Sequence, residues 1–189
     1  MATKDTQDWL EAYLELCTLI KATIPEIEHI DLWYDQLSYE LQEYPYPPKS
    51  LFIDFNATSI DTIGIKAQDM NFNVGFIFAF DTVSDSFDDS PNQAIALEFG
   101  TTLRKIHSMI HGLSGDNFSS MNRNGFGKEN APQHCIAYRQ TYACIIRDYG
   151  AIDDTEETDL GAIPVTLQIT KGAGTPPEDL EMFPGIPNT

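Results

Sequence analysis

Residues Asn71–Phe80 read Asn-Phe-Asn-Val-Gly-Phe-Ile-Phe-Ala-Phe. Every second residue is large and apolar, which is the period of a β-strand whose side chains point alternately to opposite faces. The apolar positions are Phe72, Val74, Phe76, Phe78 and Phe80. This segment therefore predicts a strand with a heavily aromatic inner face.

Two other segments alternate in the same way. Leu51, Ile53 and Phe55 share one face of a strand predicted over 51–55. A long strand is expected over roughly 134–149. Its apolar face would carry Ile136, Tyr138, Tyr142, Cys144 and Ile146, and its other face Arg139, Thr141 and Arg147. Such alternation is typical of an antiparallel strand with one wet side.

Two amphipathic helices are predicted from apolar spacings of three and four. The first spans 5–22, capped by Asp5 or Thr6 and ended by Pro25. Its apolar stripe would be Trp9, Leu10, Tyr13, Leu14, Cys17 and Ile20. The second starts with Ser90 as N-cap and Pro91 at the first helical position, and Gly112 stops it after His111. Its stripe would be Ile95, Phe99, Leu103, Ile106 and Ile110. A short helix over Asp35–Glu43 is a further possibility.

These elements indicate an α+β fold over residues 1–150. Strands follow one another without regular crossover helices, which favours an antiparallel sheet with the N-terminal and central helices packed on it. From Ala151 the composition becomes acidic and rich in Pro and Gly. Residues 151–189 are interpreted as an extension or arm, ordered where it touches a partner or where Val165, Leu167 and Ile169 pair with a sheet edge.

A long loop is expected over 114–133, because this stretch is rich in Ser, Asn and Gly. Loops of this length tend to be functional or ordered by a partner. The loop is therefore a candidate subunit contact, through Phe118, Met121, Arg123, Phe126 and Lys128. The alternative is that Phe118, Met121 and Phe126 tuck against the core of the same chain.

Charge is the strongest global signal, with 29 acidic against 11 basic residues and a net charge of −18. A field of that sign repels phosphate backbones and argues against sequence-reading or wrapping of DNA. Solubility alone would explain the acidity. The sharper interpretation is a surface past which a polyanion slides without sticking.

Localisation follows from the absence of two signals. Apolar runs are far shorter than the roughly 18–20 residues that cross a bilayer, and the N-terminus lacks a signal-peptide pattern, so a cytoplasmic site of synthesis and action is expected. Cys17, Cys135 and Cys144 are interpreted as buried, reduced thiols.

No motif predicts catalysis, a metal or a cofactor. His107 and His111 have a spacing that suits a metal, but no third ligand is evident, and a structural role near a helix C-terminus, where the dipole favours a proton, is the competing interpretation. His134 and Cys135 are neighbours on a strand and point to opposite faces. Gly125-Phe-Gly127-Lys128 lacks the spacing of a phosphate-binding loop. The acidic clusters match no calcium-binding loop. A non-enzymatic role is therefore expected.

Several local strings, together with the order of elements, resemble the tail terminator, or tail-completion, proteins of tailed bacteriophages, in particular those from prophages of gut Bacteroidetes-type bacteria. The strings are His29-Ile-Asp-Leu-Trp-Tyr-Asp-Gln-Leu37, Tyr44-Pro-Tyr-Pro-Pro-Lys-Ser-Leu-Phe-Ile-Asp-Phe55, Ala96-Leu-Glu-Phe99, Phe118-Ser-Ser-Met121 and Tyr138-Arg-Gln-Thr-Tyr142. The likeness spans about residues 5–149. The acidic extension after Ala151 departs from it.

The resemblance implies a virion protein that forms a homo-hexameric ring, ends growth of the tail tube and joins the tail to the neck. Its partners would be tail tube and neck or connector proteins, with DNA only passing through the lumen. The acids that would face this channel are Asp85, Asp88, Asp89, Asp153, Asp154, Glu156 and Glu157. Three alternatives remain: another neck or connector ring of the same particle, a free acidic module that mimics DNA, and a hydrolase whose site is not evident.

Overall fold

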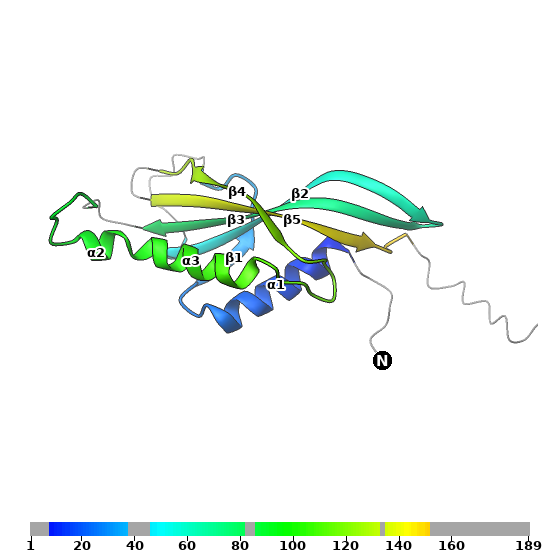
Figure 1. Cartoon of the computed structure of the whole chain (residues 1–189), viewed down its shortest axis with the longest axis horizontal. Helices are drawn as coiled ribbons and strands as arrows, with labels where there is room; N and C mark the ends of the chain where they lie inside the picture. The colour runs from blue at the N-terminus through cyan, green and yellow to red at the C-terminus, as the bar shows by residue number, and fades with distance from the viewer. Residues whose placement is uncertain (1–7, 38–45, 82–85, 133–134, 152–189) are drawn as a thin grey trace, which may run out of the picture. The chain divides into compact units, whose positions relative to one another are not determined.

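The computed structural model describes residues 8–37, 46–81, 86–132 and 135–151. All of them belong to the first of two units into which the chain divides, Met1–Thr155. The strands are β1 (His29–Leu32), β2 (Lys49–Gly64), β3 (Ala67–Asp81), β4 (Asn122–Glu129) and β5 (Cys135–Asp148), and the helices are α1 (Trp9–Thr23), α2 (Gln93–Ala96) and α3 (Glu98–Ile110). The fold is α+β, as expected (Figure 1).

The five strands form one mixed sheet in the order β1-β2-β3-β5-β4. Pairs β2–β3, β3–β5 and β4–β5 are antiparallel, but β1 pairs with β2 in parallel, with His29 opposite Ser50. The expectation of a purely antiparallel sheet is therefore wrong at this edge. A parallel pair needs a long crossover, and the connection between Leu32 and Lys49 is long enough to provide it.

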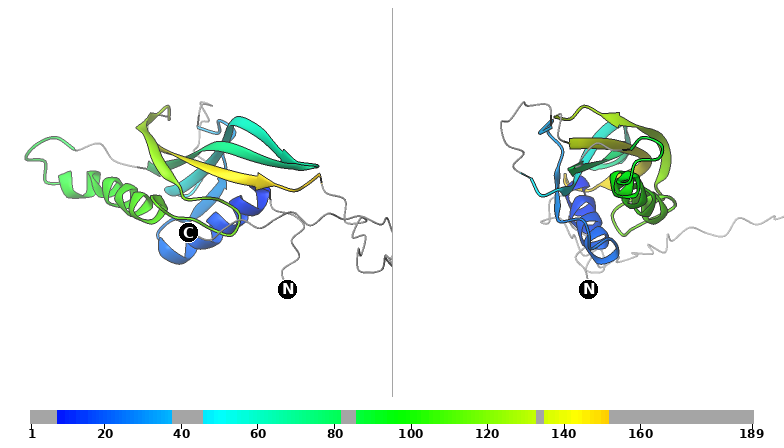
Figure 2. Two further views of the ribbon diagram at one scale, coloured as in Figure 1. Left: turned by 45° about the vertical axis from the view of Figure 1, so that its right-hand side comes forward. Right: turned by 90° about the vertical axis from the view of Figure 1, so that its left-hand side faces the viewer.

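Helices α1 and α3 lie on the same side of the sheet and bury its aromatic face (Figures 1 and 2). The predicted alternation of β3 is confirmed, because its five inner residues are all buried: Phe72, Val74, Phe76, Phe78 and Phe80. The inner face of β5 is also confirmed, with Tyr142, Cys144 and Ile146 buried beside them. The main apolar core therefore lies between α1, α3 and the face of the sheet that they cover.

The second face of the sheet, opposite the helices, is only partly exposed to solvent. Phe52, Ile77, Ala79 and Ala137 form a smaller buried cluster there, together with Leu37 and Cys135. Trp33 and Tyr46, from the connection between β1 and β2, pack against this cluster. Beyond it, Arg139 and Thr141 of β5 remain only partly covered.

The buried face of α1 differs from the prediction. Leu10 and Leu14 are 44% and 50% exposed, whereas Ile20 of the predicted stripe is buried together with Ala12 and Leu16, which the stripe did not include. Apolar residues occupy most of the circumference of this helix, so periodicity alone does not select a face. The N-cap is Asp8, whose Oδ1 accepts hydrogen bonds from the amides of Leu10 (2.8 Å) and Glu11 (3.0 Å). The expected caps, Asp5 and Thr6, lie outside the described residues.

The predicted central helix is two helices. Ser90 does not cap it directly, because the Ser90 hydroxyl accepts from the amide of Asn92 and closes a turn before α2. The helical path is interrupted at Leu97, and Ile95, placed in the predicted stripe, is 64% exposed. Gly112 ends the run with φ of 82°, as expected of a left-handed stop. The possible helix over Asp35–Glu43 falls mostly outside the described residues.

The β2–β3 hairpin is much longer than predicted. Strand β2 continues past Phe55 to Gly64, and the turn residues Ile65 and Lys66 lead into β3. Figure 1 shows the hairpin reaching beyond the two helices. The outer half lacks a core to pack against, so its sequence has no clear period of two to reveal it.

Residues 122–129, expected within a loop, form the edge strand β4 against β5. Gly125 and Gly127 weaken its strand signal.

Within the described part of the chain, no helix has both the length and the apolar character needed to cross a bilayer.

Candidate interaction surfaces

The residues predicted to form one contact loop lie in two different environments. Phe118 and Met121 are 4% and 0% exposed and belong to the main core. Arg123, Phe126 and Lys128 lie on β4, where Phe126 is 55% exposed. The alternative of tucking into the core therefore applies to Phe118 and Met121, and only the β4 residues remain on the surface.

A stack of rings, exposed at Phe126 and half-buried at Tyr138 and Phe99, runs from β4 to α3. The Arg123 guanidinium lies 4.8 Å from the centre of the Phe126 ring. Phe126 stacks on Tyr138 at 5.5 Å, and Tyr138 stacks on Phe99 at 5.5 Å. This arrangement presents a flat aromatic surface with a cation at its end, which suits contact with apolar or acidic groups.

The loop that precedes β4 is held by one carboxylate of α1. Glu15 accepts hydrogen bonds from the amides of Asp116 (2.9 Å) and Asn117 (3.1 Å), and from Asn117 Nδ2 (2.9 Å). Farther along, the Ser119 hydroxyl accepts from the amide of Ile145 at 2.8 Å. The loop is therefore held at Asp116 and Asn117 by Glu15 of α1, and at Ser119 by Ile145 of β5.

Substituting Gly115 by alanine tests this packing. The added Cβ would overlap Glu15 Oε1 and lie 2.6 Å from Phe118 Cε1. We expect the free energy of unfolding, measured in urea, to fall by about 1–3 kcal/mol. Gly127→Ala is the matched control, because nothing lies within 4 Å of its added Cβ. Equal losses in the two variants would contradict the proposed role of Glu15.

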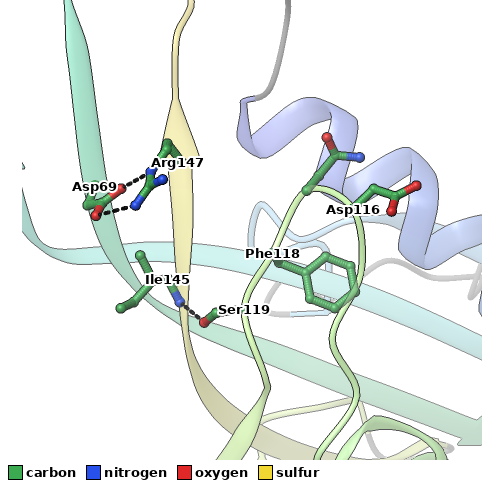
Figure 3. A pocket seen from close by; sticks show the side chains of 7 residues that line it. Asp69, Asp116, Phe118, Ser119, Ile145 and Arg147 are labelled. Carbon is green, nitrogen blue, oxygen red and sulfur yellow. Dashed lines mark hydrogen bonds and ion pairs between the residues drawn. The ribbon is translucent and has the colours of Figure 1, made fainter. Parts of the chain in front are cut away.

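An open pocket of about 290 Å³ lies beside this loop (Figure 3). Its lining residues are Asp69, Asp116, Asn117, Phe118, Ser119, Ile145 and Arg147. Arg147, one of the lining residues, is a bidentate partner of Asp69, with Nε–Oδ1 at 2.6 Å and Nη2–Oδ2 at 3.0 Å. The hydrogen bond from Arg147 lowers the pKa of Asp69. The charges of Asp69 and Arg147 are thus engaged with each other.

A buried polar chain joins α3 to β5. Gln140 Nε2 donates to the carbonyl of Leu103 (2.7 Å), and the Tyr142 hydroxyl donates to Gln140 Oε1 (2.8 Å). The Tyr142 oxygen then accepts from His107 Nδ1, at 3.0 Å. Burial raises the pKa of Tyr142 to about 12, so the phenol stays protonated at neutral pH.

His107 does not behave as expected from the helix dipole, which would favour a proton on its ring. The rings of His107 and His111 lie 5.1 Å apart, and burial, Arg123 and His111 lower the pKa of His107. His111 Nδ1 accepts from the amide of Arg123 at 3.3 Å. One nitrogen of each ring is therefore engaged. Among the described residues, no group of three or more His, Cys, Asp or Glu side chains is placed to hold a metal.

The second face of the sheet carries an ionic cluster that the sequence did not predict. Arg139 Nη1 contacts Asp54 Oδ2 at 2.5 Å, and Arg139 Nε contacts Glu129 Oε2 at 2.5 Å. A Cβ on Gly75 would lie 2.7 Å from Arg139 Nη1. Because Gly75 has no side chain, Arg139 of β5 has room to reach across β3 to Asp54 of β2. Burial lowers the pKa of Arg139, but hydrogen bonds and charges from Glu129 and Asp54 outweigh it and raise the pKa overall.

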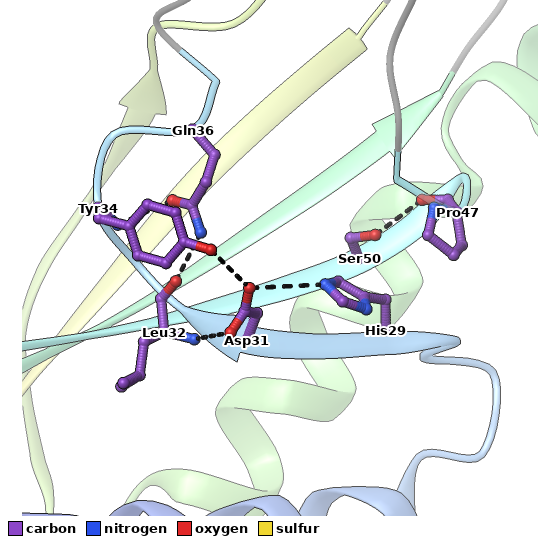
Figure 4. A network of polar contacts seen from close by, with 7 residues as sticks. All are labelled: His29, Asp31, Leu32, Tyr34, Gln36, Pro47 and Ser50. Atoms are coloured by element: carbon purple, nitrogen blue, oxygen red, sulfur yellow. Dashed lines mark hydrogen bonds and ion pairs between the residues drawn. The ribbon is translucent and has the colours of Figure 1, made fainter.

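A smaller polar network orders the segment after β1 (Figure 4). Asp31 accepts from the amide of Leu32 (2.8 Å) and from the Tyr34 hydroxyl (3.1 Å). Gln36 Oε1 accepts from the amide of Tyr34 at 2.8 Å, and Gln36 Nε2 donates to the carbonyl of Leu32. These bonds turn the chain over the second face, so this network has a structural role.

The predicted channel acids are described only in part. Asp88 and Asp89 are exposed in the turn before α2. The remaining five lie outside the described residues: Asp85, Asp153, Asp154, Glu156 and Glu157. Their position relative to any channel stays a prediction.

Two groups of exposed aliphatic side chains lie at opposite ends of the sheet. Ile60, Ile63 and Ile65 of the hairpin are 54%, 48% and 93% exposed. Ile95 and Leu97, at the α2–α3 junction, are 64% and 47% exposed.

A scan against protein-family models and a search of curated proteins found no match to this chain.

Proposed function

We propose that the protein is a structural subunit that forms a hexameric ring at the head-proximal end of a phage tail. The ring ends growth of the tail tube and joins the tail to the neck, with tube and neck or connector proteins as partners. It assembles in the host cytoplasm and remains in the virion. The observation that carries the proposal is the exposure of aliphatic side chains at two separate places, the β2–β3 hairpin and the α2–α3 junction.

We define the hairpin patch as Ile60, Ile63 and Ile65, and the junction patch as Ile95 and Leu97. Strand β3 begins beside the first patch and ends before the second, and at about 3.3 Å per residue its length is roughly 46 Å. Contact between unlike patches is head-to-tail, and head-to-tail contacts close into rings when the rotation permits.

The acidity of the chain supports a ring through which DNA passes. A net charge of −18 would line much of such an assembly with carboxylates. Repulsion between these carboxylates and phosphates lets DNA pass without adhering. Asp88 and Asp89, exposed near the junction patch, are the described residues that we place toward the lumen.

Light scattering on the purified protein tests the ring. Six copies of 21.2 kDa have a mass of about 127 kDa, and we expect this mass alone or after addition of tail tube protein. Ile65→Asp should reduce the mass to that of one chain, because it places a charge in the hairpin patch. Ser108→Asp adds the same charge at an exposed position of α3 and should leave the ring intact.

A single-chain mass under both conditions would contradict the ring. If such a monomer bound a basic protein tightly, the acidic DNA-mimic alternative would be favoured instead. A ring that survives Ile65→Asp would exclude the hairpin patch as its contact.

A further inference from the structure

The outer edge of β4 is open along a regular stretch of strand. Strand β4 is the last in the sheet order, and it pairs with β5 on one side. Its register shift lies before Gly125, so the pairing with β5 is regular from Gly125 to Glu129. Among the described residues, no other segment pairs with this stretch. Such an edge presents unpaired N–H and C=O groups, which are a template for a further strand.

An aromatic ring between two cations lies on the helix side of this edge. Phe126 lies opposite Gln140, whose side chain donates to a carbonyl of α3. The Phe126 ring is 55% exposed. Lys128, two residues farther along the strand, shares this face and is exposed. The guanidinium of Arg123 lies 4.8 Å from the centre of the Phe126 ring. A strand added to β4 would therefore meet an apolar ring with a positive charge on either side.

These two cations lack the carboxylate partners that other bases of the chain have. Within the described part of the chain, Arg123 and Lys128 form no ion pair with a carboxylate, whereas four other basic side chains do: Lys49, Lys105, Arg139 and Arg147. Because the chain has 29 acidic and 11 basic residues, two such cations beside one ring reverse its overall charge locally. Their electrostatic complement is a segment that carries carboxylates.

A second copy of this chain fits the edge less well. Pairing of β4 with β4 of another copy would bring two sets of the same cations together, and like charges that face one another are destabilising. On β2, Ile60 lies opposite Met70 of the main core, so the next residue, Asp61, points to the other face. A pairing that laid Ile60 on Phe126 would therefore turn Asp61 away from both cations. The edge is better matched to a different protein.

We propose that β4 is a docking edge for an extended segment of a different protein. The segment places an apolar side chain on Phe126 and carboxylates beside Arg123 and Lys128, and its main chain pairs with the outer edge of β4. Burial of the exposed ring supplies affinity, and the two cations select acidic segments over basic ones. This inference is independent of the proposed ring, because it involves neither the hairpin patch nor the junction patch.

Binding of a designed peptide to the full-length protein tests the docking. The probe is the fluorescently labelled peptide Thr-Glu-Thr-Leu-Thr-Glu-Thr, in which leucine and both glutamates share one face of a strand. The control peptide Glu-Thr-Thr-Leu-Thr-Thr-Glu has the same composition, but its glutamates lie on the face opposite leucine. By fluorescence anisotropy, the probe should bind at least about threefold more tightly than the control, as two exposed charge pairs imply.

Loss of the ring should weaken binding further. Phe126→Thr removes the apolar anchor but keeps a side chain that suits a strand, and it should bind the probe about tenfold more weakly. No binding of the probe to the wild type, equal affinity for the two peptides, or equal affinity of Phe126→Thr and the wild type would overturn the proposal.

Charge reversal separates a specific contact from the overall charge. Lys128→Glu should bind the probe at least about threefold more weakly than the wild type does. It should regain affinity for one of the two peptides in which a single glutamate of the probe is replaced by lysine, and that peptide reveals the direction of the added strand. Lys21→Glu makes the same change in net charge at an exposed position of α1 and should bind the probe like the wild type. Failure of both lysine peptides, or an equal loss in Lys21→Glu, would contradict the contact.

Hydrogen exchange followed by mass spectrometry identifies what occupies the edge. In the free protein, we expect the amides of 124–129 that point away from β5 to exchange rapidly, and to exchange more slowly with saturating probe. Slow exchange without probe at every protein concentration would mean that the same chain covers the edge. Slowing as the protein concentration rises would mean that a second copy does. Either result would overturn the proposal. Light scattering reports on the ring separately, so failure of one proposal is not confused with failure of the other.

Discussion

Replacing Phe76 by alanine is expected to lower the free energy of unfolding by about 3–5 kcal/mol. Phe76 is fully buried at the centre of β3, and its ring meets the edge of Tyr142 at 5.6 Å. The surrounding strands are held by pairing on both sides, so the cavity cannot collapse easily. Because domains of this size are stable by only about 5–15 kcal/mol, this loss is a large fraction of the total stability.

Urea denaturation followed by tryptophan fluorescence measures this loss, because Trp9 and Trp33 report on opposite faces of the sheet. Phe87→Ala is the matched control. The Phe87 ring is 64% exposed, and its removal should cost less than about 1 kcal/mol. If the two variants lost similar stability, the packing of β3 described above would be wrong.

Replacing Arg139 by methionine is expected to cost about 2 kcal/mol, because it leaves Asp54 and Glu129 without their shared cation. The loss is smaller than for a fully buried pair, since the side chains of Arg139, Asp54 and Glu129 are 27%, 28% and 23% exposed. Methionine retains the aliphatic stem, so most of the effect is electrostatic.

A charge-neutral variant separates the electrostatic loss from any packing defect. Arg139→Met combined with Asp54→Asn and Glu129→Gln removes the uncompensated carboxylates, and it should regain at least half of the lost stability in urea. A triple variant no more stable than Arg139→Met alone would mean that packing against Trp33, whose ring lies 5.6 Å from the guanidinium, dominates instead.

Local patterns are reliable here where large apolar side chains recur at every second position of a strand. The alternation of β3 around Phe76 and of β5 around Tyr142 predicts both strands and their inner faces, because pleating forces every second side chain into the same environment. The left-handed stop at Gly112 is equally local, since it depends on the absence of a Cβ. The α+β class follows from the order of such elements.

Elements that depend on distant partners are not predictable in this way. Strand β4, with Gly125 and Gly127, exists because β5 lies beside it, and the outer half of β2 exists because β3 pairs with it. In α1, apolar residues surround most of the helix, so only the fit of Ala12, Leu16 and Ile20 against the sheet decides which side is buried.

The features of the candidate surfaces also divide into those that depend on local sequence and those that depend on tertiary packing. Three features can be recognised in the chain alone: the spacing of apolar residues by two or by three to four, the acidic composition, and the apolar content of residues 165–170. Each depends only on near neighbours in the sequence. Three other features can be seen only in the folded sheet. They are the burial of Phe118 and Met121, the passage of Arg139 over Gly75 to Asp54, and the exposure of the hairpin and junction patches. These features join residues far apart in the chain, and only packing in three dimensions brings such residues together or leaves them uncovered.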